Sequence, residues 1–348
     1  MMVVEQLSAG SIREVSFTAA PGEVLVLLGP EGAGKRTLLR ALGGFEAVRA
    51  GRVIVDGEPI TALPPGQRPT AFVAHEDSVF GHLSVRENLG FGLRVRGLAA
   101  DVLAERVEDL ATRIGLADQL DRPAATLAPE ARWRVALARA LAVEPKVVLV
   151  DEPVGDATVG LALARTLASR QEATLIAATR ERTAALSTAD RVAFLRAGRI
   201  EQVGPPQDLF YRPRTPFVAD YVARANVLEC IVEGVSSGVV LVRLFEKRVA
   251  VPTGAGGAGQ GYTVGERALL VARPEAVRLV HEREAFTGTV RRAAFLGPLV
   301  AYEVEVAGCS LSVVDPDARP GRWYPPGSEA RLGLIPEALT LLPYPASG

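Results

Sequence analysis

The segment with the clearest chemistry is residues 24–37, VLVLLGPEGAGKRT. An apolar run ends at Gly29, a glycine-rich turn follows, and Lys35 opens a helical pattern. Backbone N–H groups and the dipole at such a helix start attract phosphates, and the lysine reaches the outer ones. The usual pattern continues with Ser or Thr, whose hydroxyl ligates Mg²⁺, but here Arg36 follows, and an arginine cannot ligate a cation. The segment therefore predicts a phosphate-binding loop with an altered metal environment. Its candidate phosphate-binding residues are Gly29, Gly32, Ala33, Gly34, Lys35, Arg36 and Thr37.

A second chemical feature is the apolar run that ends in two acids, residues 147–153, VVLVDEP. A magnesium–phosphate complex explains two adjacent carboxylates at the end of a buried strand. In that interpretation Asp151 holds a metal-bound water, and Glu152 polarises the attacking water as a catalytic group. An ordinary strand end capped by acids is the alternative. Together, the glycine-rich loop and the acidic strand end predict nucleotide binding.

The composition limits the class of protein. The 348 residues allow a large core and two domains, and 39 Lys and Arg against 40 Asp and Glu give a net charge of −1. Such a balance argues against a nucleic-acid partner. No apolar run approaches the roughly 18 residues of a membrane span, and the first residues do not have the pattern of a signal peptide. Cys230 and Cys309 are expected to be buried thiols, with a disulfide as the alternative. These features predict a soluble or peripheral, cytoplasmic protein.

The pattern of segments predicts two domains. Up to residue 222, strand-like and helical segments alternate, which is typical of an α/β domain with a mainly parallel sheet. The predicted strands are residues 23–28, 52–55, 71–74, 146–150, 174–178 and 191–195, and the predicted helices are residues 35–42, 101–114, 131–142 and 159–170. From residue 223 to 348, short β-type segments between Gly- and Pro-rich turns predict a small all-β barrel or sandwich. Residues 254–261 are interpreted as a glycine-rich turn within it.

The order and spacing of further segments resemble the ATP-binding subunit of an ABC importer. Within that family, the chain is similar to the subfamily for sugars, polyamines, ferric iron and other oxyanions, which carries a C-terminal regulatory barrel. The matching segments are residues 80–93, 134–142 with 144–146, 189–191 with 198–204, and 273–275. The resemblance implies a P-loop NTPase (ABC ATPase) domain at residues 1–222, with a helical subdomain at about 76–142. It also implies a TOBE-like, all-β domain of OB type at residues 223–348.

At several positions the chain departs from the family pattern. The family has a glutamine that touches Mg²⁺ and senses the permease where this chain has His75, although a solvated loop histidine is an equally good interpretation. The family's switch histidine corresponds to Arg180, which cannot shuttle a proton. His75 and Arg180 are therefore candidate catalytic positions with altered chemistry. We hypothesise that Arg36 and Arg180 partly replace the charge of the metal.

The family's signature loop, Leu-Ser-Gly-Gly-Gln, is also altered. Residues 127–131 read LAPEA, so the serine hydroxyl is lost, Pro129 removes an N–H donor and Glu130 adds a negative charge. Pro and Glu suit the first turn of a helix, so the helix should form while its anion site fails. In the family this loop clamps the γ-phosphate of ATP on the opposite subunit. A homodimer would therefore have two weakened ATP sites. In a heterodimer with a partner that has the family's usual residues, one ATP site would contain the altered loop of this chain and the other its altered segment 127–131.

The resemblance implies ATP as ligand and Asp151 as metal ligand, with the dependence on Mg²⁺ in doubt because of Arg36. Implied partners are transmembrane permease subunits, docked around residues 75–98, a second ATP-binding subunit and, indirectly, a solute-binding protein. The expected location is the inner face of the cell membrane, through the permease. Three functions stay open: an importer ATPase, a non-hydrolytic nucleotide-binding subunit with a regulatory or structural role, and an interaction module without ATP.

Overall fold

The computed structural model describes residues 1–75, 79–236, 238–252, 261–280, 285–317 and 323–345. The contacts divide the chain into two compact units, Met1–Pro206 and Gln207–Gly348. The predicted domain boundary after residue 222 falls one residue before the end of a short helix in the second unit and stays a prediction. The predicted turn at residues 254–261 lies outside the described residues except for Gly261.

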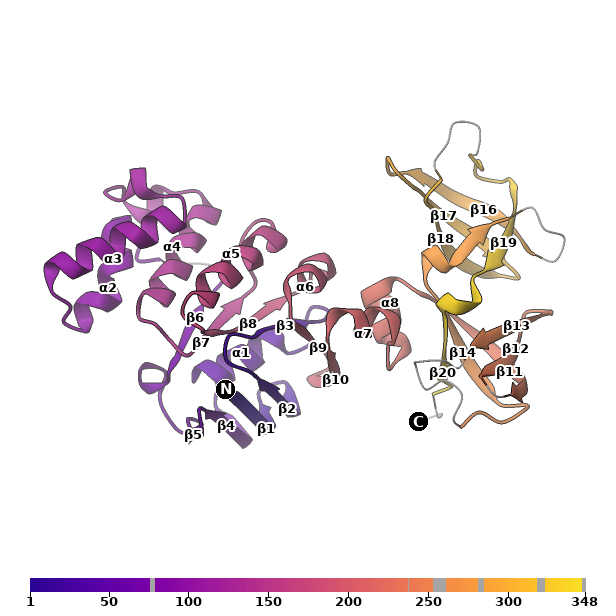
Figure 1. Cartoon of the computed structure of the whole chain (residues 1–348), viewed down its shortest axis with the longest axis horizontal. Coiled ribbons are helices and arrows are strands. Elements are labelled where there is room, and N and C mark those ends of the chain that lie inside the picture. Colours follow the sequence, from indigo (N-terminus) through magenta and orange to yellow (C-terminus); the bar gives the residue numbers. More distant parts are fainter. Residues whose placement is uncertain (76–78, 237, 253–260, 281–284, 318–322, 346–348) are drawn as a thin grey trace. The chain divides into compact units, whose positions relative to one another are not determined.

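A six-stranded sheet forms the centre of the first unit, as Figure 1 shows. Its strands, in spatial order, are β10 (Arg199–Gly204), β9 (Arg191–Arg196), β3 (Val24–Leu28), β8 (Thr174–Thr179), β7 (Val147–Asp151) and β6 (Thr70–Val73). All neighbours pair in parallel except β10 with β9. β3 and β7 are buried along their whole length, as expected for strands covered on both faces. The mainly parallel sheet predicted from the sequence is confirmed.

A second, antiparallel sheet packs against the first through an apolar core. Its strands, in spatial order, are β2 (Ile12–Ala19), β1 (Met2–Ala9), β4 (Val48–Val55) and β5 (Glu58–Pro59). Helix α1 (Lys35–Gly43) contributes to the same core, whereas α5 (Ala157–Ser169) and α6 (Arg182–Thr188) cover the other face of the parallel sheet (Figure 1). The strand predicted at residues 52–55 is thus part of the antiparallel sheet.

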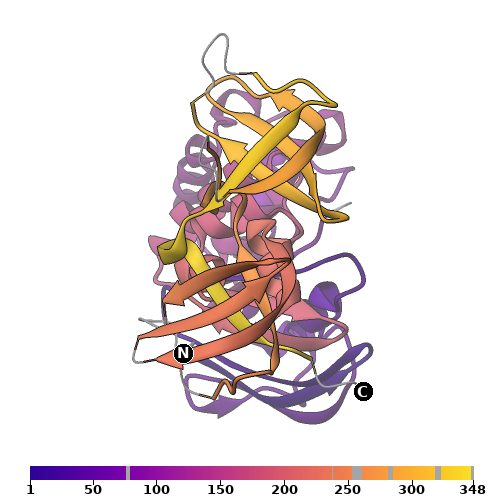
Figure 2. The ribbon, with the colours of Figure 1, turned by 90° about the vertical axis from the view of Figure 1, so that its right-hand side faces the viewer.

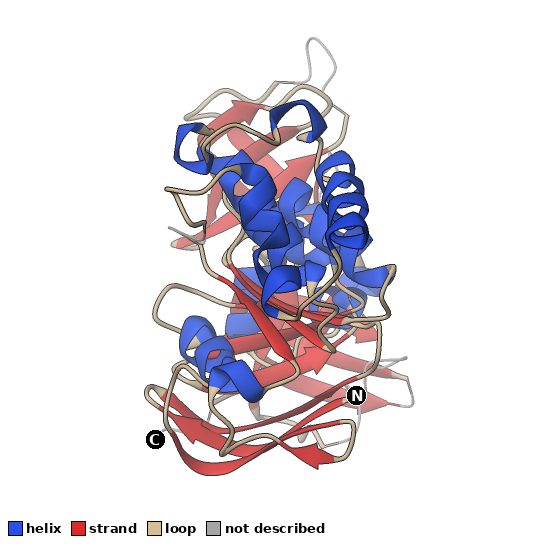
Figure 3. Cartoon of the chain, turned by 90° about the vertical axis from the view of Figure 1, so that its left-hand side faces the viewer, coloured by secondary structure: helices blue, strands red, loops and turns tan. Residues whose placement is uncertain are grey.

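Three helices form a separate helical layer in the first unit: α2 (Val85–Val95), α3 (Ala100–Arg113) and α4 (Pro129–Ala142) (Figures 1 and 3). Asn88 is fully buried at its centre. Its side chain accepts a hydrogen bond from the Phe80 amide at 2.9 Å and donates to the carbonyls of Phe80 and Ser84. Arg139 of α4 donates to the same side chain at 3.1 Å, which ties α4 to α2. The prediction that α4 would form despite its altered first turn is confirmed, with Pro129 as its first residue.

The second unit begins within α7 (Pro206–Tyr211). It includes α8 (Pro216–Ala223) and continues with two five-stranded antiparallel sheets, which Figure 2 shows. The strands of one sheet, in spatial order, are β13 (Lys247–Pro252), β12 (Val239–Leu244), β11 (Asn226–Ser236), β14 (Arg267–Ala272) and β20 (Leu339–Pro343). The strands of the other are β15 (Val277–Leu279), β19 (Glu329–Leu334), β16 (Phe286–Phe295), β17 (Val300–Val306) and β18 (Cys309–Asp315). One apolar core joins both sheets, as the all-β prediction requires. Short 3₁₀ turns lie at Pro65–Gln67, Ala117–Gln119, Ala124–Thr126, Pro274–Ala276 and Pro336–Ala338.

The two cysteines differ in their surroundings. Cys230 is 3% exposed and donates to the Ala268 carbonyl, in agreement with the prediction of a buried thiol. The prediction was wrong for Cys309, which is exposed because it begins the edge strand β18 beside a turn. Both are free thiols, so the alternative of a disulfide is excluded. In the part of the chain that the structure describes, no helix is long and apolar enough to cross a membrane.

We expect a thiol reagent at about pH 8 to modify Cys309 in the folded protein and to leave Cys230 unmodified. Burial raises the pKa of Cys230 to about 11, and only the thiolate reacts. Mass spectrometry should therefore find a single label in the native protein and a second after denaturation. A Cys309→Ser variant should gain no label in the native state. Native labelling of that variant would contradict the burial of Cys230.

Candidate functional site

The turn between β3 and α1 has a backbone that requires glycine. A Cβ atom at Gly29 would lie 2.2 Å from the Leu195 carbonyl oxygen, so only glycine fits there. Gly32 and Gly34 have φ values of 73° and 99°, in the left-handed region. No side chain caps α1, which begins at Lys35. The N–H groups of its first turn are therefore available to an anion.

Gly32, Gly34 and Lys35 line a pocket of about 370 Å³. The lining consists of Ser11, Glu31, Gly32, Ala33, Gly34, Lys35, Arg36, Thr37, His75, Asp151, Glu152, Ala178 and Arg180. The structure thus brings together every predicted site residue except Gly29, whose carbonyl accepts a hydrogen bond from Lys35. Their roles in binding and catalysis stay predictions. Ser11 and Glu31 were not predicted, because neither has a distinctive spacing from the loop.

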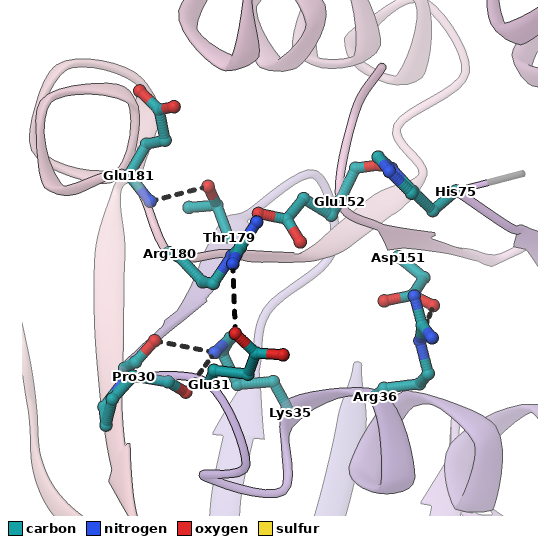
Figure 4. Close-up of polar contacts among 11 residues, drawn as sticks. Pro30, Glu31, Lys35, Arg36, His75, Asp151, Glu152, Thr179, Arg180 and Glu181 are labelled. Carbon is teal, nitrogen blue, oxygen red and sulfur yellow. Dashed lines mark hydrogen bonds and ion pairs between the residues drawn. The ribbon is translucent and has the colours of Figure 1, made fainter. Parts of the chain in front are cut away.

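Lys35 lies inside the loop. Its Nζ donates to the carbonyls of Gly29 at 2.6 Å and Pro30 at 2.7 Å, and the residue is 9% exposed (Figure 4). Burial lowers the pKa of Lys35, while the negative charge of Glu152 opposes that change. Both partners are neutral carbonyls, so the positive charge of Lys35 is not cancelled within its own hydrogen bonds. The pocket therefore contains a cation that an incoming phosphate can pair with.

Arg36 forms an ion pair with Asp151. Its Nε donates to Oδ2 of Asp151 at 2.6 Å, although the two residues are 115 positions apart (Figure 4). The side chain of Asp151 is 9% exposed at the end of β7, whereas that of Arg36 is 62% exposed. Because one partner is largely in solvent, the pair stabilises the fold by about 1 kcal/mol at most. The ion pair matters for the chemistry of the site, because the guanidinium of Arg36 is paired with the carboxylate that was predicted to be the metal ligand.

Arg180 forms a second set of ion pairs across the pocket. Its Nε donates to Oε1 of Glu152 at 3.1 Å, and its Nη1 lies 3.4 Å from Oε2 of Glu31 (Figure 4). Glu152 has a φ of 49°, in the left-handed region that residues other than glycine seldom adopt. His75 is half-buried, and its Nδ1 donates to the Glu152 carbonyl at 2.8 Å. This hydrogen bond ties one ring nitrogen of His75 to the backbone, and the catalytic role of His75 stays a prediction.

The donor atoms of the pocket do not fit a magnesium ion, which requires oxygen ligands in a nearly octahedral arrangement. Asp151 is paired with Arg36, and Glu31 and Glu152 are paired with Arg180. The hydroxyl of Thr37 lies 3.2 Å from that of Ser11. Among the described residues there is no group of three His, Cys, Asp or Glu side chains that could hold a metal. The predicted metal role of Asp151 stays a prediction, and in this structure its carboxylate is paired with Arg36.

The altered segment 127–131 does not line this pocket. At the start of α4, Glu130 lies against the loop after β7, so close that a Cβ atom at Gly155 would be 2.7 Å from its Cγ. This first turn offers a proline and a carboxylate where an anion site would need N–H donors and a hydroxyl.

Arg68 holds the far end of α1 and was missed in the sequence. It is 8% exposed, and its Nη1 donates to the carbonyls of Ala41 and Leu42 in the last turn of α1, at 2.9 and 2.8 Å. Its Nε and Nη2 donate to the carbonyls of Leu63 and Thr61. Four carbonyls thus share one guanidinium, which fixes the helix that begins with Lys35. An arginine in a Pro-rich loop gives no signal of such a role.

Comparison with known proteins agrees with this architecture. A family model described as "ABC transporter" matches residues 12–155, and one described as "TOBE domain" matches residues 270–342. The chain therefore belongs to the ABC transporter family and carries a C-terminal TOBE domain, which confirms the resemblance and the fold class predicted from the sequence.

Particular relatives refine this assignment. The chain is 34% identical over 312 residues to the Fe(3+) ions import ATP-binding protein FbpC 1 of Rhizobium meliloti, covering 88% of this chain and 86% of the relative. It is 33% identical over 352 residues to the spermidine/putrescine import ATP-binding protein PotA 1 of Pseudomonas aeruginosa, covering 95% and 92%. A solved structure of cbiO1 from Clostridium perfringens, part of an ABC transporter complex, superposes with a TM-score of 0.56 at 26% identity, covering 64% of this chain and 92% of that chain.

We expect Arg68→Ala to lower the free energy of unfolding by about 3 kcal/mol, because it leaves buried carbonyls without donors. Arg68→Lys should recover only part of this loss, since an ammonium does not reproduce the planar fork. Urea unfolding followed by circular dichroism measures both. The matched control is Arg170→Ala, at an exposed position after α5, where a change within about 0.5 kcal/mol is expected. Equal stability of the Arg68→Ala and wild-type proteins would show that these hydrogen bonds do not hold α1.

Proposed function

We propose that this chain is the ATP-binding, energy-coupling subunit of an ABC importer for a small solute, with ATP bound at residues 29–37. The observation that carries the proposal is the position of Lys35, which lines the pocket, is buried at the uncapped start of α1 and donates to neutral carbonyls. Relatives named for import of Fe(3+) ions and of spermidine/putrescine support an importer, and they do not agree on a solute.

The proposed partners are a transmembrane permease, a second ATP-binding subunit and, through the permease, a solute-binding protein. The likeness to part of an ABC transporter complex supports an assembly of this kind. The surface proposed for the permease, residues 75–98, includes α2, where Phe91 and Val95 are 40% and 75% exposed. Adjacent exposed apolar side chains favour a protein interface. In such an assembly the chain works at the inner face of the cell membrane.

A second function is supported by the ion pair between Arg180 and Glu152: a nucleotide-binding subunit that does not hydrolyse ATP. The proposed catalytic role of Glu152 needs its carboxylate to accept a proton from water. One oxygen of this carboxylate accepts a hydrogen bond from a guanidinium, which cannot give up its charge. Binding can continue under these conditions, because Lys35 and the loop amides are not involved in that ion pair.

We expect Lys35→Ala to weaken ATP binding about tenfold or more, since the variant loses a charge-assisted contact with phosphate. The matched control is Lys146→Ala, an exposed lysine 3.7 Å from Asp56 and outside the pocket lining, which should bind like the wild type. Isothermal titration calorimetry of the full chain measures both affinities. If both variants bind ATP with equal affinity, the nucleotide binds away from Lys35. If neither variant nor the wild type binds ATP, the proposed binding is wrong.

If the complex with permease hydrolyses ATP, Glu152→Gln should lower steady-state turnover by about 100-fold or more, the contribution expected of a general base. ATP binding should stay within about threefold of wild type. The control is Glu172→Gln, an exposed glutamate outside the pocket lining, which should retain full turnover. Turnover that survives in Glu152→Gln would indicate a contaminating ATPase. Wild-type binding without turnover would favour the non-hydrolytic function, and the absence of both would leave an interaction module.

A further inference from the structure

We propose that the loop at residues 29–37 binds nucleotide phosphates without a divalent cation. In this proposal Arg36, held in place by Asp151, supplies positive charge where a metal ion usually lies, and Mg²⁺ weakens nucleotide binding. The proposal rests on the proposed function, since it concerns the same pocket and ATP as its ligand. It goes further in stating which form of ATP the pocket prefers, the metal-free nucleotide over its magnesium complex.

The orientation of Arg36 carries the first step. Asp151 is fixed at the end of a buried strand, and its Oδ2 accepts the Nε hydrogen of Arg36 at 2.6 Å. The ion pair thus holds the guanidinium between the start of α1 and the end of β7. Arg36 also lines the pocket. Its terminal nitrogens make no hydrogen bond with any residue that the structure describes. A guanidinium in this state can donate two parallel hydrogen bonds to phosphate oxygens.

The charges around the pocket carry the second step. The cations Lys35, Arg36 and Arg180 line it together with the carboxylates of Glu31, Asp151 and Glu152. All three carboxylates are in ion pairs with the two arginines. Lys35 instead bonds to neutral carbonyls, so its positive charge can attract phosphate. Nucleotide phosphates that approach this pocket therefore meet fixed positive charge before any metal has bound.

The same arrangement disfavours a magnesium–nucleotide complex. A divalent cation on the phosphates would approach the guanidinium of Arg36 with like charge and would have to displace it to reach Asp151. No hydroxyl is available at position 36 to compensate, since the side chain there has only N–H donors. Mg²⁺ also cancels part of the phosphate charge that Lys35 and Arg36 attract. Free nucleotide is thus expected to bind more tightly than its magnesium complex.

A specific alternative exists, because the side chain of Arg36 is 62% exposed. The arginine can swing into solvent when a magnesium–nucleotide complex arrives, which would leave Asp151 to the metal. In that case Mg²⁺ would strengthen binding in the wild-type protein. The two possibilities therefore predict opposite signs for the effect of the metal, and a binding measurement separates them.

The test is an ATP titration of the full chain by calorimetry, with EDTA and with excess Mg²⁺, at equal pH and ionic strength. We expect the wild-type dissociation constant to rise about threefold or more in Mg²⁺. Arg36→Ser places a hydroxyl after Lys35 and releases Asp151 from its cation, so Mg²⁺ should then lower the dissociation constant about tenfold or more. Circular dichroism verifies that each variant is folded.

Two control variants separate the charge of Arg36 from the metal site. Arg36→Lys retains a cation without a hydroxyl, so Mg²⁺ should still fail to strengthen binding. The double variant with Arg36→Ser and Asp151→Asn has the hydroxyl but lacks the carboxylate, so the gain from Mg²⁺ should be lost. Tighter binding of ATP in Mg²⁺ than in EDTA by the wild-type protein would overturn the inference and leave the proposed function intact. Absence of ATP binding in both conditions would overturn the proposed function and this inference with it.

Discussion

The candidate site depends on the parallel alignment of neighbouring strands. β3, β8, β7 and β6 lie side by side in this order and run in the same direction, so their carboxyl ends meet at one edge of the sheet. The start of α1, which follows β3, contributes Lys35 and Arg36, β7 ends with Asp151, and Arg180 directly follows β8. Three segments that are distant in sequence thus supply charged residues to one pocket. A shift in the pairing of β7 by a single residue would turn Asp151 to the other face of the sheet and remove its contact with Arg36.

A feature of this structure can be predicted from the sequence when neighbouring residues determine it. It cannot be predicted in the same way when it depends on residues far apart in the chain. The loop at residues 29–37 is predictable, because its glycines report a local backbone requirement, and the structure shows that requirement at Gly29. The buried strand before Asp151 is predictable for a similar local reason. The partner of Arg36 is not predictable, because the contact joins two segments 115 positions apart and depends on strand order. The sequence therefore indicated the two arginines and the two carboxylates of the site, but not the ion pairs between them.

Other features escaped prediction for physical reasons of their own. β1 and β2 are amphipathic, with alternating burial and charged residues on their exposed faces, so they lack the apolar runs that mark the central strands. Arg68 donates to four backbone carbonyls. Every residue has a backbone carbonyl, so the sequence does not show which ones an arginine will contact. Cys309 was misjudged because burial on an edge strand depends on which strands lie beside it. Each of these errors concerns the environment of a residue and leaves the fold class unaffected.

The altered positions are compatible with the fold, although they change the chemistry of the site. Pro129 and Glu130 suit the first turn of α4, so this helix forms and Asn88 and Arg139 still join it to α2. Arg36 and Arg180 form ion pairs with carboxylates that would otherwise repel one another. Each substitution is thus compatible with the surrounding fold, although it removes a group on which metal or γ-phosphate chemistry depends in the family pattern. In the proposed dimer, the pocket of this chain and its segment 127–131 serve different nucleotides. An intact partner would therefore give each nucleotide one altered element, whereas two copies of this chain would give each nucleotide both.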